Sequence, residues 1–382
     1  MKRLSSATFQ RSPERAILVG ISRGGGAARD LALELLAELA ELTRSAGATV
    51  VDKVLQVRPK PDSATYVGSG LVAQIAARIE PEKISVVIFD DPLSPAQFRN
   101  LEEELQVSVI DRSRLILDIF ASRAHTAEAM TQVELAQLEY LLPRLTRQWS
   151  HLSRLRSAIG ARGPGETQLE VDRRLIREKI AVLKERLRKI DRQRATRRRG
   201  REKFLNVAFA GYTNAGKSTL FNRITKAKVA VANQLFVTLD PTSRVMGTPY
   251  PRQAVLTDTV GFIRKLPHEL VESFKSTLEE VVDADVIVHV IDCADPQCQA
   301  KMDQTEKTLS EIGATATIVR VFNKIDANPE FSPPFHSTHS SILTSAITGE
   351  GVSDLKQLLL EFAARRLVTR ANSVIQLPAV PQ

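Results

Sequence analysis

Residues 205–221 constrain the fold most, because they join an apolar run, a loop that contains two glycines and the apolar start of a helical pattern. The loop reads Gly211-Tyr-Thr-Asn-Ala-Gly-Lys-Ser218. Glycines in this pattern let the backbone wrap around a phosphate group with its N–H groups pointing inward. Lys217 would then reach the β- and γ-phosphates of a nucleotide, and the Ser218 hydroxyl would bind Mg²⁺. The sequence therefore predicts a strand, a phosphate-binding loop and a helix.

A second motif, Asp258-Thr-Val-Gly261, follows the apolar run 254–257. We expect Asp258 to hold Mg²⁺ through water and the Gly261 N–H to contact the γ-phosphate. Between the two motifs lies the segment 235–242, which contains two threonines. One of them would complete the Mg²⁺ shell when the γ-phosphate is present, which makes this segment the first switch. Thr238 is the preferred residue for this role, and Thr242 is the alternative.

A third motif, Asn323-Lys-Ile-Asp326, follows the apolar run 318–322 and indicates a preference for guanine. The Asp326 carboxylate can accept hydrogen bonds from N1 and N2 of guanine, while Asn323 meets the acceptor side of the base. Adenine lacks this pair of donors and would leave Asp326 buried and unpaired, which gives strong selectivity. Ser345 and Ala346 would cover the base with a backbone N–H. We therefore expect GTP and GDP as ligands.

These motifs define a complete nucleotide site. The predicted nucleotide-binding residues are Gly211, Tyr212, Thr213, Asn214, Ala215, Gly216, Lys217, Ser218, Thr219, Phe236, Thr238, Asp258, Gly261, Asn323, Lys324, Asp326, Ser345 and Ala346. Within this set, Lys217, Thr238 and Gly261 are the candidate catalytic residues. Ser218, Thr238 and Asp258 are the candidate Mg²⁺ ligands.

Strand-like apolar runs alternate with helical periodicity at both ends of the chain, which predicts an α/β fold. Residues 204–367 are expected to form a P-loop domain with a doubly wound, mostly parallel sheet. Residues 1–120 are expected to form a small N-terminal α/β domain, and residues 368–382 a short C-terminal tail. Composition supports a globular chain, since 43% of the residues are hydrophobic and 25% are charged.

Residues 121–203 have a different character. Two narrow leucine-rich stripes at heptad spacing predict two long helices, packed antiparallel as a hairpin and joined by the Gly-rich loop 157–166. Pro143 should kink the first helix. The segment from Arg144 to Lys203 has 20 Lys and Arg against 7 Asp and Glu, whereas the rest of the chain has 33 against 37. Such local charge is typical of nucleic-acid binding, and a solvated basic surface is the simpler alternative.

Cysteine content and hydropathy exclude disulfide-rich, zinc-binding and membrane-spanning proteins. Cys293 and Cys298 are too few for a disulfide framework or a zinc site. The longest apolar runs, such as 16–21, are far too short to span a bilayer, and the N-terminus lacks a secretory signal. We therefore expect a cytoplasmic protein without membrane insertion; a transit-like N-terminus is the alternative.

Residues 204–367 resemble the translation-factor-related GTPases, and in particular the HflX family. The resemblance rests on the segments 236–242, 258–267 and 274–280, and it continues upstream through Gly163-Pro-Gly-Glu-Thr-Gln-Leu-Glu170, so that it covers residues 16–367. Three features depart from the family. Ser157-Ala158 stand in place of a usual glycine pair, Leu71 in place of a common lysine, and the C-terminal domain of longer members is reduced to a tail.

The resemblance implies a GTPase that associates with the large ribosomal subunit and its RNA and helps to dissociate or rescue stalled ribosomes, often under stress. Arg162, Arg173 and Arg174 are the candidate RNA contacts, because guanidinium groups pair bidentately with phosphate. Asn214 resembles the asparagine of potassium-dependent relatives, so it is a candidate K⁺ ligand; a plain turn residue is the alternative. We expect a monomer and no DNA partner.

Phe262 follows Gly261 at the position where many switch GTPases place a glutamine that orients the attacking water. A phenyl ring cannot orient water by hydrogen bonding. We therefore predict slow intrinsic hydrolysis, with another group or a partner positioning the water.

Two other functions stay open on the residues alone. One is an RNA-remodelling NTPase with a second nucleotide site in the N-terminal domain, where the run Gly24–Gly26 follows a strand but no Lys-Ser or Lys-Thr pair comes after it. ATP hydrolysis that survives Lys217→Ala would favour this function. The other is a regulatory GTPase that docks on proteins through its hairpin. Complexes whose stability does not depend on salt concentration would favour this function.

Overall fold

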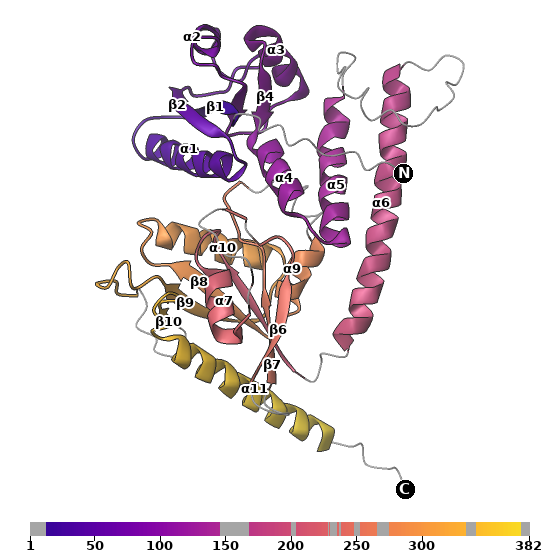
Figure 1. Ribbon diagram of the computed structural model, residues 1–382, viewed down its shortest axis with the longest axis vertical. Coiled ribbons are helices and arrows are strands. Elements are labelled where there is room, and N and C mark those ends of the chain that lie inside the picture. Colours follow the sequence, from indigo (N-terminus) through magenta and orange to yellow (C-terminus); the bar gives the residue numbers. More distant parts are fainter. Residues whose placement is uncertain are drawn as a thin grey trace, which may run out of the picture. The chain divides into compact units, whose positions relative to one another are not determined.

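The computed structural model spans residues 1–382 and describes 13–145, 168–199, 204–227, 229, 235–236, 238–247, 253–265, 275–333 and 341–375. Arg162 and the predicted loop 157–166 lie outside these residues. The chain forms two compact units. One consists of Met1–Ser122 with Gln137–Ile180, and the other of Arg123–Ala136 with Ala181–Gln382. Figure 1 gives the element labels used below.

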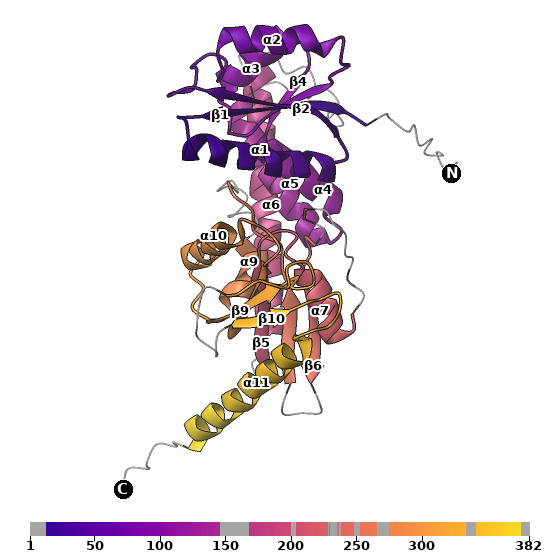
Figure 2. The same cartoon turned by 90° about the vertical axis from the view of Figure 1, so that its left-hand side faces the viewer.

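The N-terminal unit contains a four-stranded sheet in the order β2-β1-β3-β4, and every neighbouring pair is parallel. The strands are β1 (Arg15–Ser22), β2 (Thr49–Val57), β3 (Val86–Phe89) and β4 (Ser108–Asp111). Helix α1 covers one face of this sheet, and α2 and α3 cover the other (Figure 2). These helices are Ala27–Ser45, Ser69–Ile79 and Pro95–Leu105. The residues from Ala16 to Val19 are fully buried, which is typical of a strand covered on both faces.

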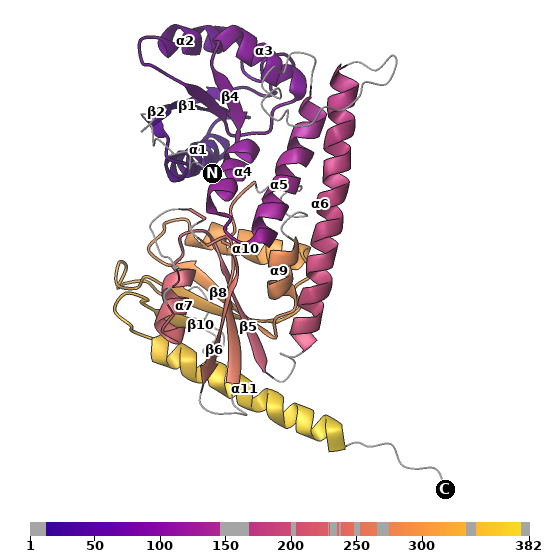
Figure 3. The same ribbon diagram turned by 45° about the vertical axis from the view of Figure 1, so that its right-hand side comes forward.

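The described part of the predicted hairpin segment, 121–203, contains the last residues of α4, two further helices and a short 3-10 turn. These are α4 (Arg112–Arg123), α5 (Ala127–Leu141), η1 (Leu142–Arg144) and α6 (Gln168–Arg199). Pro143 lies in the 3-10 turn that follows α5, because proline lacks the backbone donor that a continuing helix needs. Helix α6 is one continuous helix of 32 residues (Figure 3). Within the described ranges, no helix has both the length and the hydropathy that crossing a bilayer requires.

The second unit contains a six-stranded sheet in the order β10-β9-β8-β5-β7-β6. The strands are β5 (Leu205–Gly211), β6 (Thr242–Gly247), β7 (Gln253–Asp258), β8 (Val286–Asp292), β9 (Thr317–Asn323) and β10 (Ser341–Thr344). All neighbouring pairs are parallel except β6 with β7. The predicted α/β fold with a mostly parallel sheet is therefore confirmed, and the antiparallel edge strand β6 is an addition to it.

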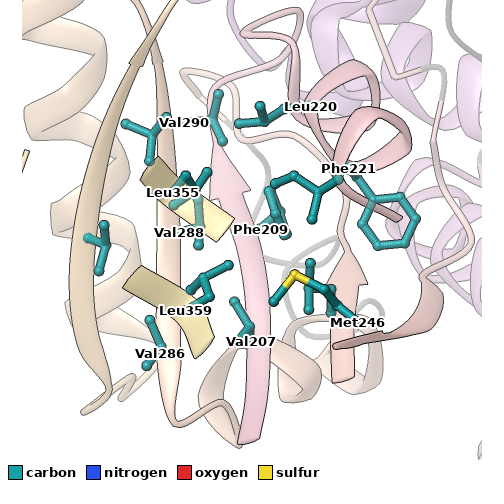
Figure 4. Packing of buried hydrophobic residues seen from close by; sticks show 14 of the residues in the cluster. Val207, Phe209, Leu220, Phe221, Met246, Val286, Val288, Val290, Leu355 and Leu359 are labelled. Atoms are coloured by element: carbon teal, nitrogen blue, oxygen red, sulfur yellow. The ribbon is translucent and has the colours of Figure 1, made fainter. Parts of the chain in front are cut away.

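Alternate residues of β5 point to opposite faces of this sheet. Val207 and Phe209 belong to a cluster with α7 (Lys217–Thr225) and α11 (Val352–Ile375), and Figure 4 shows them together with Phe221 and Leu355. Ala208 and Ala210 belong to the cluster that includes residues of α9 (Lys275–Val282) and α10 (Cys298–Glu311). Helix α11 extends to Ile375, into the segment that the sequence predicted as a tail. Parallel strands β5, β8 and β9 present their carboxyl ends at one edge, where ligands bind in such sheets.

Candidate functional site

The phosphate-binding loop (211–218) connects the end of β5 to the start of α7. Its two glycines have positive φ angles of 146° at Gly211 and 92° at Gly216. A Cβ atom at Gly211 would clash with the Val290 carbonyl oxygen, and one at Gly216 with the Asn323 amide. Both positions therefore require glycine for conformational and for steric reasons.

Lys217 is the first residue of α7 and is only 6% exposed. Its Nζ donates hydrogen bonds to the carbonyl oxygens of Gly211 at 3.1 Å and Tyr212 at 2.8 Å, so the ammonium group lies against the phosphate-binding loop. Burial lowers the pKa of Lys217 to about 8. A phosphate group bound at this helix N-terminus would stabilise the charged form.

Three oxygen-bearing side chains meet beside the start of α7. Ser218 Oγ donates to Asp258 Oδ2 at 2.6 Å and lies 2.8 Å from Thr238 Oγ1. Thr238 Oγ1 in turn lies 3.4 Å from Asp258 Oδ2. Burial raises the pKa of Asp258, and among the described residues its Oδ1 has no hydrogen-bond partner. Hard oxygen ligands of this kind fit Mg²⁺. The structure brings Thr238 to this point, whereas Thr242 is the first residue of β6.

The Asp258–Gly261 motif is joined to the phosphate-binding loop through the backbone. Phe262 N donates to Gly211 O at 3.0 Å, and Thr213 N donates to Phe262 O at 2.8 Å. A Cβ atom at Gly261 would lie 2.8 Å from Thr213 Cα and 2.9 Å from Lys217 Nζ, so Gly261 packs directly on the loop. Tyr212 supports this contact, because its hydroxyl accepts from Arg264 N at 2.8 Å.

The Phe262 side chain lies in the hydrophobic core. It is 3% exposed and packs in the cluster that contains Ala208, Ala210, Val281, Ile287 and Leu309. The Phe262 side chain is therefore buried in the core, while its backbone is hydrogen-bonded to the phosphate-binding loop.

The guanine motif is connected to both neighbouring loops by Asn323. Its Nδ2 donates to Ala215 O at 2.9 Å, and its Oδ1 accepts from Ala346 N at 3.0 Å. Lys324 forms an ion pair with Asp292, with 2.6 Å between Nζ and Oδ2. The Asp326 side chain is exposed, so a guanine base could reach it from the solvent. The structure thus places the three predicted motifs and Ser345–Ala346 at one edge of the sheet.

Sequence reasoning missed three polar residues at this edge. Asp292, which orients Lys324, is the last residue of β8, so its place at a strand end was the signal that could have revealed it. Lys301 pairs with Asp295, and its Nζ lies 5.0 Å from the centre of the Tyr212 ring. No sequence pattern connects Lys301 to a loop so far away in the chain.

The two described RNA candidates differ in environment. Arg173 is half-buried and its Nη2 donates to Leu145 O at 3.0 Å, so it also helps to hold the start of α6. Arg174 is exposed. The exposed basic residues of α6 are Arg174, Arg177, Lys179, Lys184, Arg186, Arg188, Lys189 and Arg192. Glu170, Glu178 and Glu185 are the exposed acidic residues among the described side chains of this helix, so its surface is strongly basic.

Comparisons with known proteins identify the family. Residues 34–121 match the model described as GTP-binding GTPase N-terminal, 123–201 that of the GTP-binding GTPase middle region, and 206–324 that of a 50S ribosome-binding GTPase. A GTPase HflX of Lacrimispora saccharolytica is 49% identical over 351 residues, which are 91% of this chain and 82% of the relative. The chain belongs to the HflX family of GTPases. The HflX protein of Escherichia coli K12 is 46% identical over 355 residues, with the same coverage of both chains.

A solved structure supports the fold. The crystal structure of the SsGBP and GDP complex matches 92% of this chain and 99% of its own, with a TM-score of 0.51 and 25% identity. The predicted resemblance to the HflX family and the predicted GTPase are confirmed by these comparisons. HflX proteins act on GTP, so the nucleotide motifs belong to the family's enzyme activity.

Proposed function

We propose that this HflX-family GTPase binds the large ribosomal subunit in its GTP state and helps to separate or rescue stalled ribosomes. The observation that carries the proposal is the presence in one chain of a converged guanine-nucleotide site and a long helix, α6, with a strongly basic surface. The match of residues 206–324 to a 50S ribosome-binding GTPase supports the choice of partner.

The nucleotide would be held by residues from several strand ends. The phosphate-binding loop, including Tyr212, Thr213, Ala215 and Thr219, would surround the phosphates. Asn323, Lys324, Asp326 and Ser345–Ala346 would recognise guanine. Ser218, Thr238 and Asp258 would hold Mg²⁺, which would neutralise negative charge on the phosphates. The unpartnered Asp258 Oδ1 and the two neighbouring hydroxyls support this fit.

The γ-phosphate would control the two switch segments. Thr238 would join the Mg²⁺ shell and the Gly261 N–H would donate to the γ-phosphate, so that both segments are ordered only with GTP. Phe236 in the first segment is buried and has a φ angle of 57°, a conformation that costs free energy in a non-glycine residue. Hydrolysis would release both contacts and weaken ribosome binding.

A K⁺ ion beside Asn214 would add positive charge near the γ-phosphate, where negative charge develops in the transition state. Asn214 is exposed in the phosphate-binding loop and has a φ angle of 62°. We expect faster hydrolysis in K⁺ than in Na⁺ at equal ionic strength. Equal rates in the two salts would contradict a K⁺ site and would favour a turn residue.

Ribosomal RNA would be bound by the exposed basic residues of α6, with Arg174 and Arg173 near its start. Arg162 would add to this surface. Contacts of Lys and Arg with phosphate weaken steeply as salt rises. Binding should therefore fall by about tenfold or more between 50 and 200 mM salt if several phosphates are contacted.

Co-sedimentation with isolated ribosomal subunits tests this proposal. We expect the protein to pellet with large subunits in a non-hydrolysable GTP analogue, and much less in GDP or with small subunits. The double variant Lys184→Gln, Arg188→Gln should weaken this binding. Arg99→Gln, Lys307→Gln is a matched control, because both residues are exposed basic residues on other helices. Binding to large subunits that changes neither with the nucleotide nor with the α6 substitutions would overturn the proposal.

A further inference from the structure

Thr213 is a buried residue of the phosphate-binding loop whose hydroxyl has no hydrogen-bond partner among the described residues. The residue is 7% exposed. The other buried threonines that the structure describes in this unit are paired; for example, Thr259 Oγ1 donates to Phe209 O at 2.6 Å, and Thr305 Oγ1 to Lys301 O at 2.9 Å. A buried hydroxyl without a partner destabilises a folded protein. Such a group in a native fold calls for a functional explanation.

Thr213 lies beside two residues that are expected to contact the γ-phosphate. A Cβ atom at Gly261 would lie 2.8 Å from both Cα and Cγ2 of Thr213 and 2.9 Å from Lys217 Nζ. Thr213, Gly261 and Lys217 therefore surround one point. Lys217 and the Gly261 N–H are the groups expected to contact the γ-phosphate, whereas the guanine side of the site is formed at Ala215 and Asn323. Thr213 thus lies on the γ-phosphate side.

Phe262, the residue after Gly261, supplies no side-chain group that could position a water molecule. Its side chain is packed in the core and offers no hydrogen bond. A threonine hydroxyl is both a donor and an acceptor, so it can donate to a γ-phosphate oxygen or hold a water molecule beside the phosphorus atom.

We infer that Thr213 is a catalytic residue that binds the attacking water through Oγ1 and holds it in line with the γ-phosphorus atom of GTP. This inference rests on the proposed GTPase site. The water oxygen forms a bond to the γ-phosphorus atom as the bond from this atom to the β,γ-bridging oxygen breaks, which leaves GDP. The water proton passes to the phosphate product, and Thr213 itself stays protonated. Its contribution is orientation, which is the task of glutamine in other switch GTPases.

Two substitutions separate this role from packing. Thr213→Val keeps the shape and removes the hydroxyl, whereas Thr213→Ser keeps the hydroxyl. We expect single-turnover GTP hydrolysis to fall by about 10–100-fold in Thr213→Val and to stay near the wild-type rate in Thr213→Ser. The dissociation constants of GDP and of a non-hydrolysable GTP analogue should change little in both variants.

Thermal unfolding of the nucleotide-free protein gives a second readout. Thr213→Val removes an unpartnered buried hydroxyl, so its unfolding midpoint should equal or exceed that of the wild type. Thr305→Val, which removes a paired buried hydroxyl, should lower the midpoint and leave hydrolysis unchanged. Wild-type hydrolysis in Thr213→Val, or an equal loss in Thr213→Ser, would overturn the inference. If the wild-type protein binds no GTP, the proposed function fails as well, and that result is separate from any difference between the variants.

Discussion

Thr126 donates its hydroxyl proton to Asp240, with 2.5 Å between Oγ1 and the carboxylate Oδ1. The backbone N–H groups of His125 and Thr126 also donate to this carboxylate, each at 3.3 Å. Thr126 Oγ1 accepts from Ala129 N at 3.1 Å, so Thr126 caps the start of α5. Asp240 lies two residues after Thr238, and the predicted first switch segment is therefore connected to the N-terminus of α5.

Asp240→Asn should loosen this connection. A negative charge at a helix N-terminus stabilises the helix by about 0.3–1 kcal/mol at an exposed position. We expect faster amide hydrogen exchange at residues 125–130 and a loss of unfolding free energy of about that size. Asp303→Asn, which changes an exposed aspartate of α10, is the control. Unchanged exchange at the start of α5 would contradict the connection.

Gly261→Ala should separate GTP binding from GDP binding. The new methyl group would press on Thr213 Cα and Lys217 Nζ, and the segment from Gly261 to Phe262 would have to move away from the phosphate-binding loop. We expect the affinity for a non-hydrolysable GTP analogue to fall by about tenfold or more, because the Gly261 N–H is expected to contact the γ-phosphate, with little change for GDP. Fluorescence titration with labelled nucleotides measures both. Gly70→Ala is the control, because a Cβ there meets no atom within 4 Å. An equal loss for GTP analogue and GDP would count against this role of Gly261.

Asp326→Asn should change the base preference. The exposed carboxylate is expected to accept from two guanine N–H groups, and an amide cannot accept both. We expect GTP affinity to fall by about 100-fold or more and affinity for xanthosine triphosphate to rise, because the amide can donate to the extra carbonyl oxygen of xanthine. Competition binding with the two nucleotides measures the switch. Retained GTP preference would mean that another residue recognises the base.

Glu306 should make the fold sensitive to acid. His289 and Arg320 beside it lower the pKa of Glu306 to about 2, and Arg320 donates to both carboxylate oxygens, at 2.7 and 2.9 Å. Since the unfolded pKa is 4.5, this contribution is fully present above pH 4.5 and is lost as pH falls toward 2. Glu306→Gln should lower the unfolding free energy at pH 7 by about 1.5–3 kcal/mol, and the difference should shrink in acid. Denaturant unfolding across this pH range measures it. A difference that is constant with pH would contradict the lowered pKa.

The sequence predicted those parts of the fold that depend on local patterns. The predicted alternation of strands and helices in residues 1–120 is found in the N-terminal unit, where β1, α1, β2, α2, β3, α3 and β4 follow one another along the chain. Each nucleotide motif was assigned to a strand end, and the structure has Asp258 and Asn323 as the last residues of β7 and β9. Motifs of this kind can be located from sequence because strand and loop are adjacent in the chain.

Other parts depend on contacts between distant residues. In strand β6, Met246 is buried but Val245 is exposed, so the sequence of this strand has little of the apolar pattern that predicts strands. Its strand conformation depends on pairing with β7. The leucine stripe across Pro143 favoured one long helix, whereas α5 ends at Leu141. The contact of Thr126 with Asp240 joins residues 114 positions apart, and no sequence pattern predicts it. Likewise, an unpartnered hydroxyl at Thr213 can be recognised only from the packing around it.

Light scattering of intact ribosomes mixed with this protein tests the central claim most directly. The three conditions are GTP, a non-hydrolysable GTP analogue and GDP. We expect scattering to fall with GTP and with the analogue but not with GDP, because binding in the GTP state would separate the subunits and hydrolysis would serve release. No fall in any condition, together with no co-sedimentation with large subunits, would contradict the ribosomal function.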